Sequence, residues 1–487
     1  MGKLTWLAPL HTRMEEADLQ AIVEAGERVL RKVGMTIDGT DEFFDYLRAF
    51  GCEIVSTHVH FPDRVVDEVM ARIAEYRQAR PTEEIPPVPP TEVTWSTSGQ
   101  ALWCCDPKTD QLRPATKRDL ADLCRVIDSV EGLERTHPTF IPQDAPLETR
   151  EFHAFVTIIL NSREPHRVSA YSAEIVPYYY EALKVVCGSQ DAAKAALRSL
   201  LPCKVWINSP FMIAQEDIEA PMRLRELTAQ PLVFNSMPVA GVATPVTIAG
   251  ALTQMVAEVI GANILSLAVD HHLCGWCVGP LSFDMKTGIH TQWGPETVFL
   301  HAGSAQVARY LFGGTPRLHA PMTTAAKQPG AQSMMEKAFG MGMGFLAGAR
   351  SFGGLTTLAF SDVGSVVQLM MELELVSCVR KMAAGFDVDP DRIAEAVIEE
   401  VAPRGAYYLN HDHTLTYFRD EQWFPRLMDR RVPMAWRENP RTMVDNARDR
   451  ALQLIQTAPN QCPLSKDQRR DLREILKAAD QNVGGRE

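Results

Sequence analysis

The stretch that decides the fold begins with Cys203-Lys-Val-Trp-Ile-Asn208 and continues to a second apolar run, Pro231-Leu-Val-Phe-Asn-Ser236. Both runs are short and rich in β-branched or aromatic residues, which favours buried strands. A longer segment with helical periodicity follows each run, over 216–228 and over 245–267. A repeated strand–helix unit is typical of parallel strands joined by crossover helices.

The same alternation extends along the chain in both directions. The predicted strands cover 93–97, 136–141, 166–171, 203–208, 231–236, 272–278, 316–320 and 351–355. The predicted helices that follow them cover 117–130, 148–161, 173–187, 216–228, 245–267, 295–311, 331–347 and 362–384. Eight such units close a barrel, whereas an open doubly wound sheet usually has a glycine-rich turn after its first strand, and Ser98-Gly99-Gln100 is no such turn. The sequence therefore predicts an α/β fold, a (β/α)8 TIM barrel.

Two helical regions are expected to flank this barrel. Residues 1–90 are predicted to form an N-terminal helical region that ends in a proline-rich linker from Arg80 to Pro90. The barrel is expected to occupy 91–386, and 387–487 should form a C-terminal helical extension. Amphipathic patterns predict N-terminal helices over 14–33, 41–50 and 63–77.

The composition of the 487 residues excludes several classes of protein. Hydrophobic residues make up 46% and charged residues 23%, a balance that argues against disorder. The formal net charge of −12 repels nucleic-acid phosphates and anionic lipid. The N-terminus lacks the apolar core of a signal peptide, and the longest apolar stretch, 245–269, is interrupted by polar side chains. We therefore expect a cytoplasmic protein with no nucleic-acid or membrane partner.

The cysteine and histidine clusters are weak candidates for metal sites. Cys274 and Cys277 lie in a predicted strand, where positions i and i+3 face opposite sides, so buried thiols are the simpler interpretation. His411 and His413 lack an evident third ligand. We expect no metal site in this chain.

Polar and aromatic residues gather where the predicted strands end, which is where barrels carry their chemistry. The candidate catalytic residues are Asp144, His319, Gln332 and Glu336. The candidate substrate-binding residues are Tyr171, Trp206, Asn208, Asn235, Trp276, His290, Trp293, Lys327 and Phe352. The set includes no Walker loop, GxSxG elbow or HExxH helix. Its aromatic and amide groups suit binding of a cation better than hydrolysis of a bond.

Several longer segments carry a resemblance to a known family. They are Pro238–Leu252, Gln254–Glu258, Asp284–Gly288, Gly330-Ala331-Gln332 with Glu336, and His413-Thr414 with Phe418, Arg419 and Trp423. In this order they resemble the trimethylamine methyltransferase family, in its pyrrolysine-lacking branch of quaternary-amine:corrinoid methyltransferases. The last segment makes His413 a further candidate for substrate binding.

The resemblance implies a barrel enzyme that transfers a methyl group to the cobalt of a small corrinoid protein. Since no cobalamin-binding domain is recognised in the sequence, we expect this chain to hold no permanent cofactor itself. The trimethylamine-specific branch carries pyrrolysine in the loop after the seventh strand, where this chain has ordinary residues from Lys327 to Gly330. A quaternary ammonium needs no further activation, because its departing amine is neutral. The resemblance therefore implies a quaternary amine such as glycine betaine as the methyl donor.

A permanent cation would be bound by aromatic rings through cation–π attraction. If the donor is a betaine, His290, His319 or Lys327 could donate hydrogen bonds to its carboxylate. Larger betaines, such as proline betaine or carnitine, are alternatives within this chemistry. Two other classes also stay open: a barrel lyase or isomerase that uses Asp144 and His319 as an acid–base pair, and a non-catalytic betaine-binding protein. Assembly into a homo-oligomer is compatible with the sequence.

Overall fold

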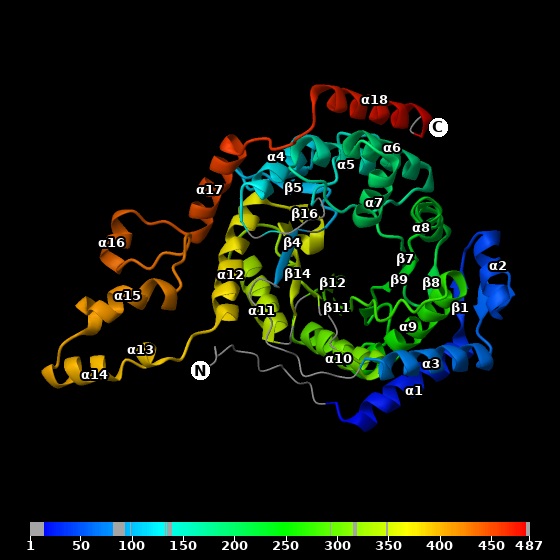
Figure 1. Cartoon of the computed structure of the whole chain (residues 1–487), viewed down its shortest axis with the longest axis horizontal. Helices are drawn as coiled ribbons and strands as arrows, with labels where there is room; N and C mark the ends of the chain where they lie inside the picture. Colours follow the sequence, from blue (N-terminus) through cyan, green and yellow to red (C-terminus); the bar gives the residue numbers. More distant parts are fainter. Residues whose placement is uncertain are drawn as a thin grey trace.

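The computed structural model describes residues 14–80, 93–97, 99–131, 133, 139–292, 294–314, 319–346 and 349–483. In Figure 1 helices follow one another in chain order around a ring, with strands inside it. The helices are α4 (Lys117–Asp128), α5 (Arg150–Asn161), α6 (Val176–Cys187), α7 (Gln190–Leu200), α8 (Gln215–Thr228), α9 (Ile248–Asp270), α10 (Pro295–Phe312), α11 (Ala331–Leu346) and α12 (Val366–Ala384). The inner strands are β4 (Thr94–Thr97), β7 (Lys204–Ile207), β9 (Val233–Ser236), β13 (His319–Pro321) and β14 (Ser351–Leu355).

The inner strands pair in parallel, as crossover helices require. Strand β14 lies between β13 and β4, and β7 pairs with β9. The strands thus form two arcs, β13–β14–β4 and β7–β9. A single parallel bridge extends each arc, from Ala101 to Phe140 in the first and from Ser236 to Val278 in the second. Each arc follows the neighbour order of a barrel. The mixed α/β class is thus confirmed, while closure of the inner strands into one barrel stays a prediction.

Two predicted strands are wrong. Over 166–171 the backbone forms no strand, because the N–H of Val168 donates to the carbonyl of Leu200 at the end of α7. Over 272–278 only Val278 forms a bridge. There the side chain of Asn263 accepts from the Gly275 N–H and donates to the Gly275 carbonyl, each at 3.0 Å, so Gly275 is bonded to a helix instead of a strand. Helix α7 was not predicted, and parts of the predicted strands 136–141 and 316–320 lie outside the described residues.

Shorter strands add hairpins and caps at the strand ends. They are β5 (Trp103–Cys105), β6 (Leu112–Pro114), β8 (Met212–Ile213), β10 (Val239–Ala240), β11 (Leu281–Asp284), β12 (Ile289–Thr291), β15 (Thr357–Leu358) and β16 (Val363–Gly364). Strands β11 and β12 form an antiparallel hairpin, and β15 pairs antiparallel with β16. These segments follow the carboxyl ends of the inner strands, and we call this end of the ring the mouth.

The N-terminal region covers the outside of helix α9. It consists of α1 (Glu16–Val33), β1 (Met35–Ile37), α2 (Asp41–Phe50), β2 (Glu53–Val55), β3 (His58–His60) and α3 (Asp63–Gln78). Gly26 allows α1 to approach α9 closely, since a Cβ there would lie 2.7 Å from Cβ of Val256. By length and composition α9 is the one described helix that could cross a membrane, but 89% of its most apolar window is buried inside the protein. A helix was predicted over 245–267, and the polar side chains within that stretch argued against a membrane span.

The C-terminal region divides into two parts. Helix α17 (Met443–Thr457) packs on α12 and α4, and α18 (Lys466–Asn482) packs on α5 and α6. Between α12 and α17, short helices extend outward from the ring, at the left of Figure 1. They are α13 (Pro390–Ile393), α14 (Glu395–Val401), α15 (Asp412–Glu421) and α16 (Pro433–Glu438).

Candidate functional site

Three helices each carry a glutamine one turn before a buried glutamate. The pairs are Gln254–Glu258 in α9, Gln332–Glu336 in α11 and Gln368–Glu372 in α12. In each pair the amide Nε2 donates to Oε1 of the glutamate, at 3.0, 2.7 and 3.1 Å respectively. The exposed fractions of the three glutamates are 0%, 3% and 0%. Burial of a carboxylate lowers the stability of the fold unless its oxygens accept hydrogen bonds. The remaining hydrogen-bond donors to each glutamate therefore indicate its structural role.

Each glutamate accepts hydrogen bonds from the segment that follows a strand at the mouth. Glu336 Oε2 accepts from Thr324 Oγ1 at 2.5 Å and from the Ala325 N–H at 2.7 Å. Glu372 Oε2 accepts from the Thr356 N–H at 2.7 Å. The carboxylates thus fix the positions of loops whose N–H groups would otherwise need water.

Glu258 does the same after β7. Its Oε2 accepts from Ser209 Oγ at 2.8 Å and also from Ser236 Oγ, and its Oε1 accepts from the Phe211 N–H at 3.4 Å. Burial raises the pKa of Glu258, and these hydrogen bonds to the charged form oppose that shift.

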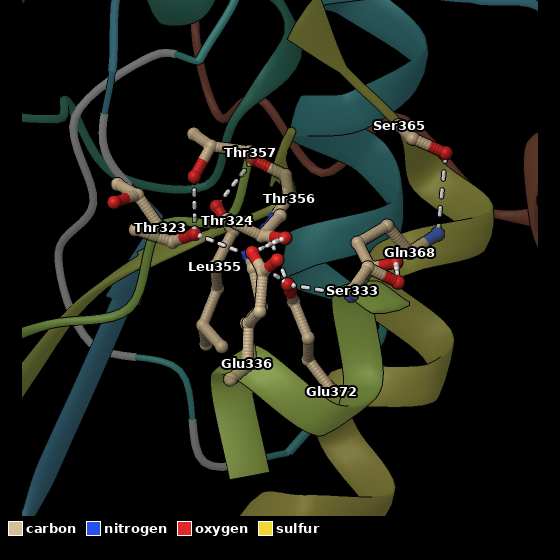
Figure 2. A network of polar contacts seen from close by, with 12 residues as sticks. Thr323, Thr324, Ser333, Glu336, Leu355, Thr356, Thr357, Ser365, Gln368 and Glu372 are labelled. Carbon is tan, nitrogen blue, oxygen red and sulfur yellow. Dashed lines mark hydrogen bonds and ion pairs between the residues drawn. The ribbon is translucent and has the colours of Figure 1, made fainter. Parts of the chain in front are cut away.

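Glu372 also has a buried counter-ion. Its Oε1 forms an ion pair with Lys337 Nζ, both side chains have an exposed fraction of 0%, and Lys337 donates to the Gly354 carbonyl at 2.9 Å. Burial lowers the pKa of Lys337 and raises that of Glu372, and their mutual attraction opposes both shifts. Figure 2 shows Glu336 and Glu372 pointing toward the loops at Thr324 and Thr356.

An aromatic ring, an imidazole and a lysine meet beside these loops. The Phe360 and His290 ring centroids are 5.2 Å apart, and Lys327 Nζ lies 5.9 Å from the Phe360 centroid. The N–H of Phe360 donates to the Thr324 carbonyl at 2.9 Å, which ties this ring to the loop held by Glu336. The loops after β13 and β14 and the hairpin β11–β12 therefore converge on Phe360.

Phe360, on which this cluster converges, was not among the residues predicted from the sequence. Its φ of 59° is positive, as are those of Ala359 at 46°, Ser361 at 91° and Thr356 at 77°. Several non-glycine residues with positive φ in one turn are uncommon and cluster at functional sites. No glycine marks this turn in the sequence, and the apolar run before it reads as the approach to a helix.

The predicted residues of the seventh loop are brought together. Gln332 and Glu336 bond to each other, and Lys327 and His290 both lie beside Phe360. Lys327 is exposed and donates to the Ala325 carbonyl at 2.7 Å. Trp293 and the side chain of His319 lie outside the described residues.

Trp206 and Asn235 lie opposite each other in the β7–β9 register. On β9 the ring of Phe234 is 6.5 Å from that of Phe43 in α2, outside the ring of helices. Because side chains alternate along a strand, Asn235 and its partner Trp206 face the inside. Their predicted place at the substrate side is compatible with this orientation.

Trp276 and Phe352, predicted as cage rings, face the helix layer instead. Trp276 Nε1 donates to Ser304 Oγ of α10 at 2.9 Å. Phe352 is fully buried and stacks on Trp95 at 6.1 Å, and Arg380 of α12 lies 4.7 Å from the Trp95 ring. Periodicity alone could not show whether either ring is turned inward, so this part of the predicted cage is corrected.

Asp144 and His413 lie apart from the Phe360 cluster. Asp144 is exposed, and its Oδ1 accepts from the Lys117 N–H at 2.9 Å, at the first residue of α4. This contact explains Asp144 as a cap of helix α4. His413 belongs to α15, where its ring lies 4.7 Å from that of Tyr417.

Tyr171 and Asn208 lie near two carboxylates. The Tyr171 N–H donates to Glu151 Oε2 at 3.0 Å, and Asn208 Nδ2 donates to Asp217 Oδ2 at 2.8 Å. Burial raises the pKa of Glu151 to about 7, against the hydrogen bonds that it accepts. Tyr171 itself is 48% exposed.

Glu151 should make the stability of the protein fall as the pH rises. A raised pKa means that folding favours the protonated carboxyl, so its stabilisation is present at pH 5 and is lost as the pH passes through 7. Between pH 5 and pH 8 the free energy of unfolding of the wild type should fall by about 1–2 kcal/mol more than that of Glu151→Gln, which lacks the titrating carboxyl. Urea titrations at both pH values measure this; the exposed Glu148→Gln is the control, and equal slopes for all three proteins would contradict the assignment.

Among the described residues, no three His, Cys, Asp or Glu side chains lie close enough to hold a metal ion. Burial raises the pKa of Cys274 to about 12, and that of Cys277 is raised for the same reason. Such thiols remain protonated, as expected of core cysteines.

Comparison with known proteins identifies the family. The family model described as "Trimethylamine methyltransferase (MTTB)" matches residues 3–484. Trimethylamine methyltransferase MttB of Desulfitobacterium hafniense (strain DSM 10664 / DCB-2) is 24% identical over 388 residues, covering 79% of this chain and 77% of that protein. Glycine betaine methyltransferase of D. hafniense (strain Y51) is 25% identical over 332 residues, covering 66% and 67%. The monomethylamine methyltransferase MtmB of Methanosarcina barkeri aligns with a TM-score of 0.40 and 13% identity over 93% of this chain and 96% of that structure. The match over residues 3–484 shows that this chain belongs to the trimethylamine methyltransferase family.

Proposed function

We propose that this chain transfers a methyl group from a quaternary amine of the glycine betaine type to the cobalt(I) of a separate corrinoid protein. The observation that carries the proposal is the family match over residues 3–484, joined by a relative named glycine betaine methyltransferase. We further propose that the two groups of parallel inner strands belong to one closed barrel, and that the corrinoid protein docks over its mouth.

In this reaction the main role of the protein is to position the methyl donor relative to the cobalt. The electron pair of cobalt(I) forms the bond to the methyl carbon, and the carbon–nitrogen bond breaks with its electron pair left on nitrogen. A neutral tertiary amine departs, and no proton is transferred. Aligning methyl, nitrogen and cobalt accounts for most of the contribution required from the enzyme.

The cluster at Phe360 supports a betaine as donor. A phenyl face attracts a quaternary ammonium, and the half-buried ring of Phe360 lies beside His290 and Lys327. Lys327 and His290 would then donate to the carboxylate at the other end of a betaine. The Phe360 ring thus lies close to the two donors, Lys327 and His290. A betaine requires this, because only a short spacer separates its ammonium from its carboxylate.

Phe360→Leu should raise KM for glycine betaine by about 2–30-fold, since cation–π attraction contributes about 0.5–2 kcal/mol and leucine keeps most of the volume but not the π face. Phe299→Leu is the matched control, because Phe299 is a 52% exposed ring on α10. Steady-state kinetics with a fixed corrinoid protein measure both. If the two variants have the same KM as the wild type, Phe360 does not contact the ammonium.

Lys327→Met should distinguish donors by their carboxylate. Loss of a charge-assisted hydrogen bond should reduce kcat/KM for glycine betaine by about 10–100-fold and leave binding of choline, which has no carboxylate, nearly unchanged. Dissociation constants for both ligands, measured by calorimetry, complete the comparison. Equal losses for the two amines would mean that Lys327 does not bind the carboxylate.

One product analysis separates this function from its alternatives. The chain is incubated with glycine betaine, choline, carnitine or proline betaine, with and without a reduced corrinoid protein, and the amines are quantified by mass spectrometry. The proposal predicts a demethylated amine only when the corrinoid protein is present. Product without it would favour a lyase or isomerase, and binding with no product under either condition would favour a binding protein.

A further inference from the structure

A glutamine at the end of the hairpin β11–β12 lies beside the proposed site. In this hairpin Ser282 lies opposite Thr291, and Phe283 lies opposite His290. The Thr291 hydroxyl contacts Ser282 Oγ, which in turn lies 2.9 Å from Thr297 Oγ1 of α10. The side chain of Thr291 is therefore turned toward the helix layer.

Gln292 follows Thr291 directly, and its side chain is half-buried. Because side chains alternate along an extended chain, residues 290 and 292 face the side opposite Thr291. On that side the His290 ring lies 5.2 Å from the ring of Phe360. The sequence position of Gln292 thus directs its amide toward the Phe360 cluster.

The amide of Gln292 is held at its oxygen. Gln292 Oε1 accepts a hydrogen bond from Thr323 Oγ1, and Thr323 itself is buried. The next residue, Thr324, accepts the hydrogen bond from the Phe360 N–H, so the same loop positions the amide and the ring. Among the residues that the structure describes, none accepts a hydrogen bond from Gln292 Nε2. This nitrogen is in contact with solvent, so its two N–H groups are available to a ligand.

We propose that Gln292 donates a hydrogen bond to the carboxylate of the betaine and makes the site select betaines over amines without a carboxylate. The inference rests on the proposed quaternary-amine donor. An amide whose oxygen is already bonded presents only N–H donors to the site, which suits an anion and not a cation. Together with Lys327 and His290, Gln292 would bind the carboxylate, while the ring of Phe360 attracts the ammonium.

Gln292→Glu tests the proposal, because glutamate keeps an oxygen for the Thr323 hydroxyl but replaces the donating NH2 group with a charged oxygen. The dissociation constant for glycine betaine, measured by calorimetry on the full chain, should rise about 100-fold or more, since two carboxylates would face each other. The dissociation constant for choline should stay within about threefold of the wild-type value or decrease, because choline has only its ammonium to interact with the new charge.

Two further variants separate the lost donor from the added charge. Gln292→Met removes the donor without adding a charge and should weaken binding of glycine betaine by about 10-fold. Gln111→Glu adds the same charge at an exposed glutamine of the β5–β6 hairpin and should leave both dissociation constants unchanged. Melting temperatures equal to that of the wild type show that the variants fold.

The proposal is wrong if Gln292→Glu binds glycine betaine as tightly as the wild type does, or if it loses glycine betaine and choline equally. A wild type that does not prefer glycine betaine to choline would also overturn it. These measurements need no corrinoid protein, so the proposal can fail while the chain still transfers methyl groups. Conversely, selective binding of betaines without methyl transfer would contradict only the proposed function.

Discussion

Replacing Lys337 with methionine should lower the free energy of unfolding by about 3–5 kcal/mol, because it leaves the carboxylate of Glu372 buried without its cation. Both side chains have an exposed fraction of 0%, so water cannot reach the unpaired group. The same change removes the hydrogen bond to the Gly354 carbonyl. Chemical denaturation monitored by circular dichroism measures the loss.

The double variant Lys337→Met with Glu372→Gln provides the control. Glutamine keeps an oxygen for the Thr356 N–H but carries no charge, so the double variant should be more stable than Lys337→Met alone. The difference measures the cost of the unpaired charge. A loss below about 1 kcal/mol in the single variant would show that the pair lies in a more solvated place than the structure shows.

Glu336→Gln should reduce kcat/KM by about 10–100-fold, because a misplacement of about 1 Å in a positioning loop can have that effect. Glu336 holds Thr324 and Ala325, and the Thr324 carbonyl in turn accepts from the N–H of Phe360. In glutamine, an NH2 group that donates hydrogen bonds replaces one of the two accepting oxygens. We therefore regard Glu336 as a positioning residue rather than a group that reacts with substrate.

Glu258→Gln is the matched control for this prediction. Glu258 occupies the corresponding place on α9 and holds Ser209 and Phe211, but not the loop that carries Lys327. Both Glu258→Gln and Glu336→Gln should lower the free energy of unfolding by about 1–2 kcal/mol. Glu258→Gln should change kcat/KM only a few-fold. Kinetics with glycine betaine distinguish the two variants. Equal losses of activity in both would mean that the carboxylates act on the fold as a whole.

Helices were predictable because their periodicity and caps are local. Thr116 accepts from the Asp119 N–H at 3.3 Å at the start of α4, as a capping box requires, and α2 spans Asp41–Phe50 as predicted. The strand predicted at 272–278 failed because the deciding contact, Asn263 to Gly275, joins a helix to a loop. An apolar run does not reveal such a partner.

The candidate site was predictable in part for the same reason. The spacing of Gln332 and Glu336 places them on one helix face, and they bond as neighbours. Phe360 could not be identified, since its position depends on a hydrogen bond to Thr324 and on a positive φ that no glycine signals. For Trp276 and Phe352, the sequence could not show whether each ring faces the mouth or the helices.

The most direct test of methyl transfer follows the cobalt. The pure chain is mixed with a corrinoid protein reduced to cobalt(I) and with glycine betaine, and the absorbance of cobalt(I) and methyl-cobalt(III) is recorded while dimethylglycine is quantified. The account predicts that one methyl-cobalt and one dimethylglycine form for each cobalt(I) consumed. If cobalt(I) persists with glycine betaine and with every other quaternary amine tried, the proposed function is wrong.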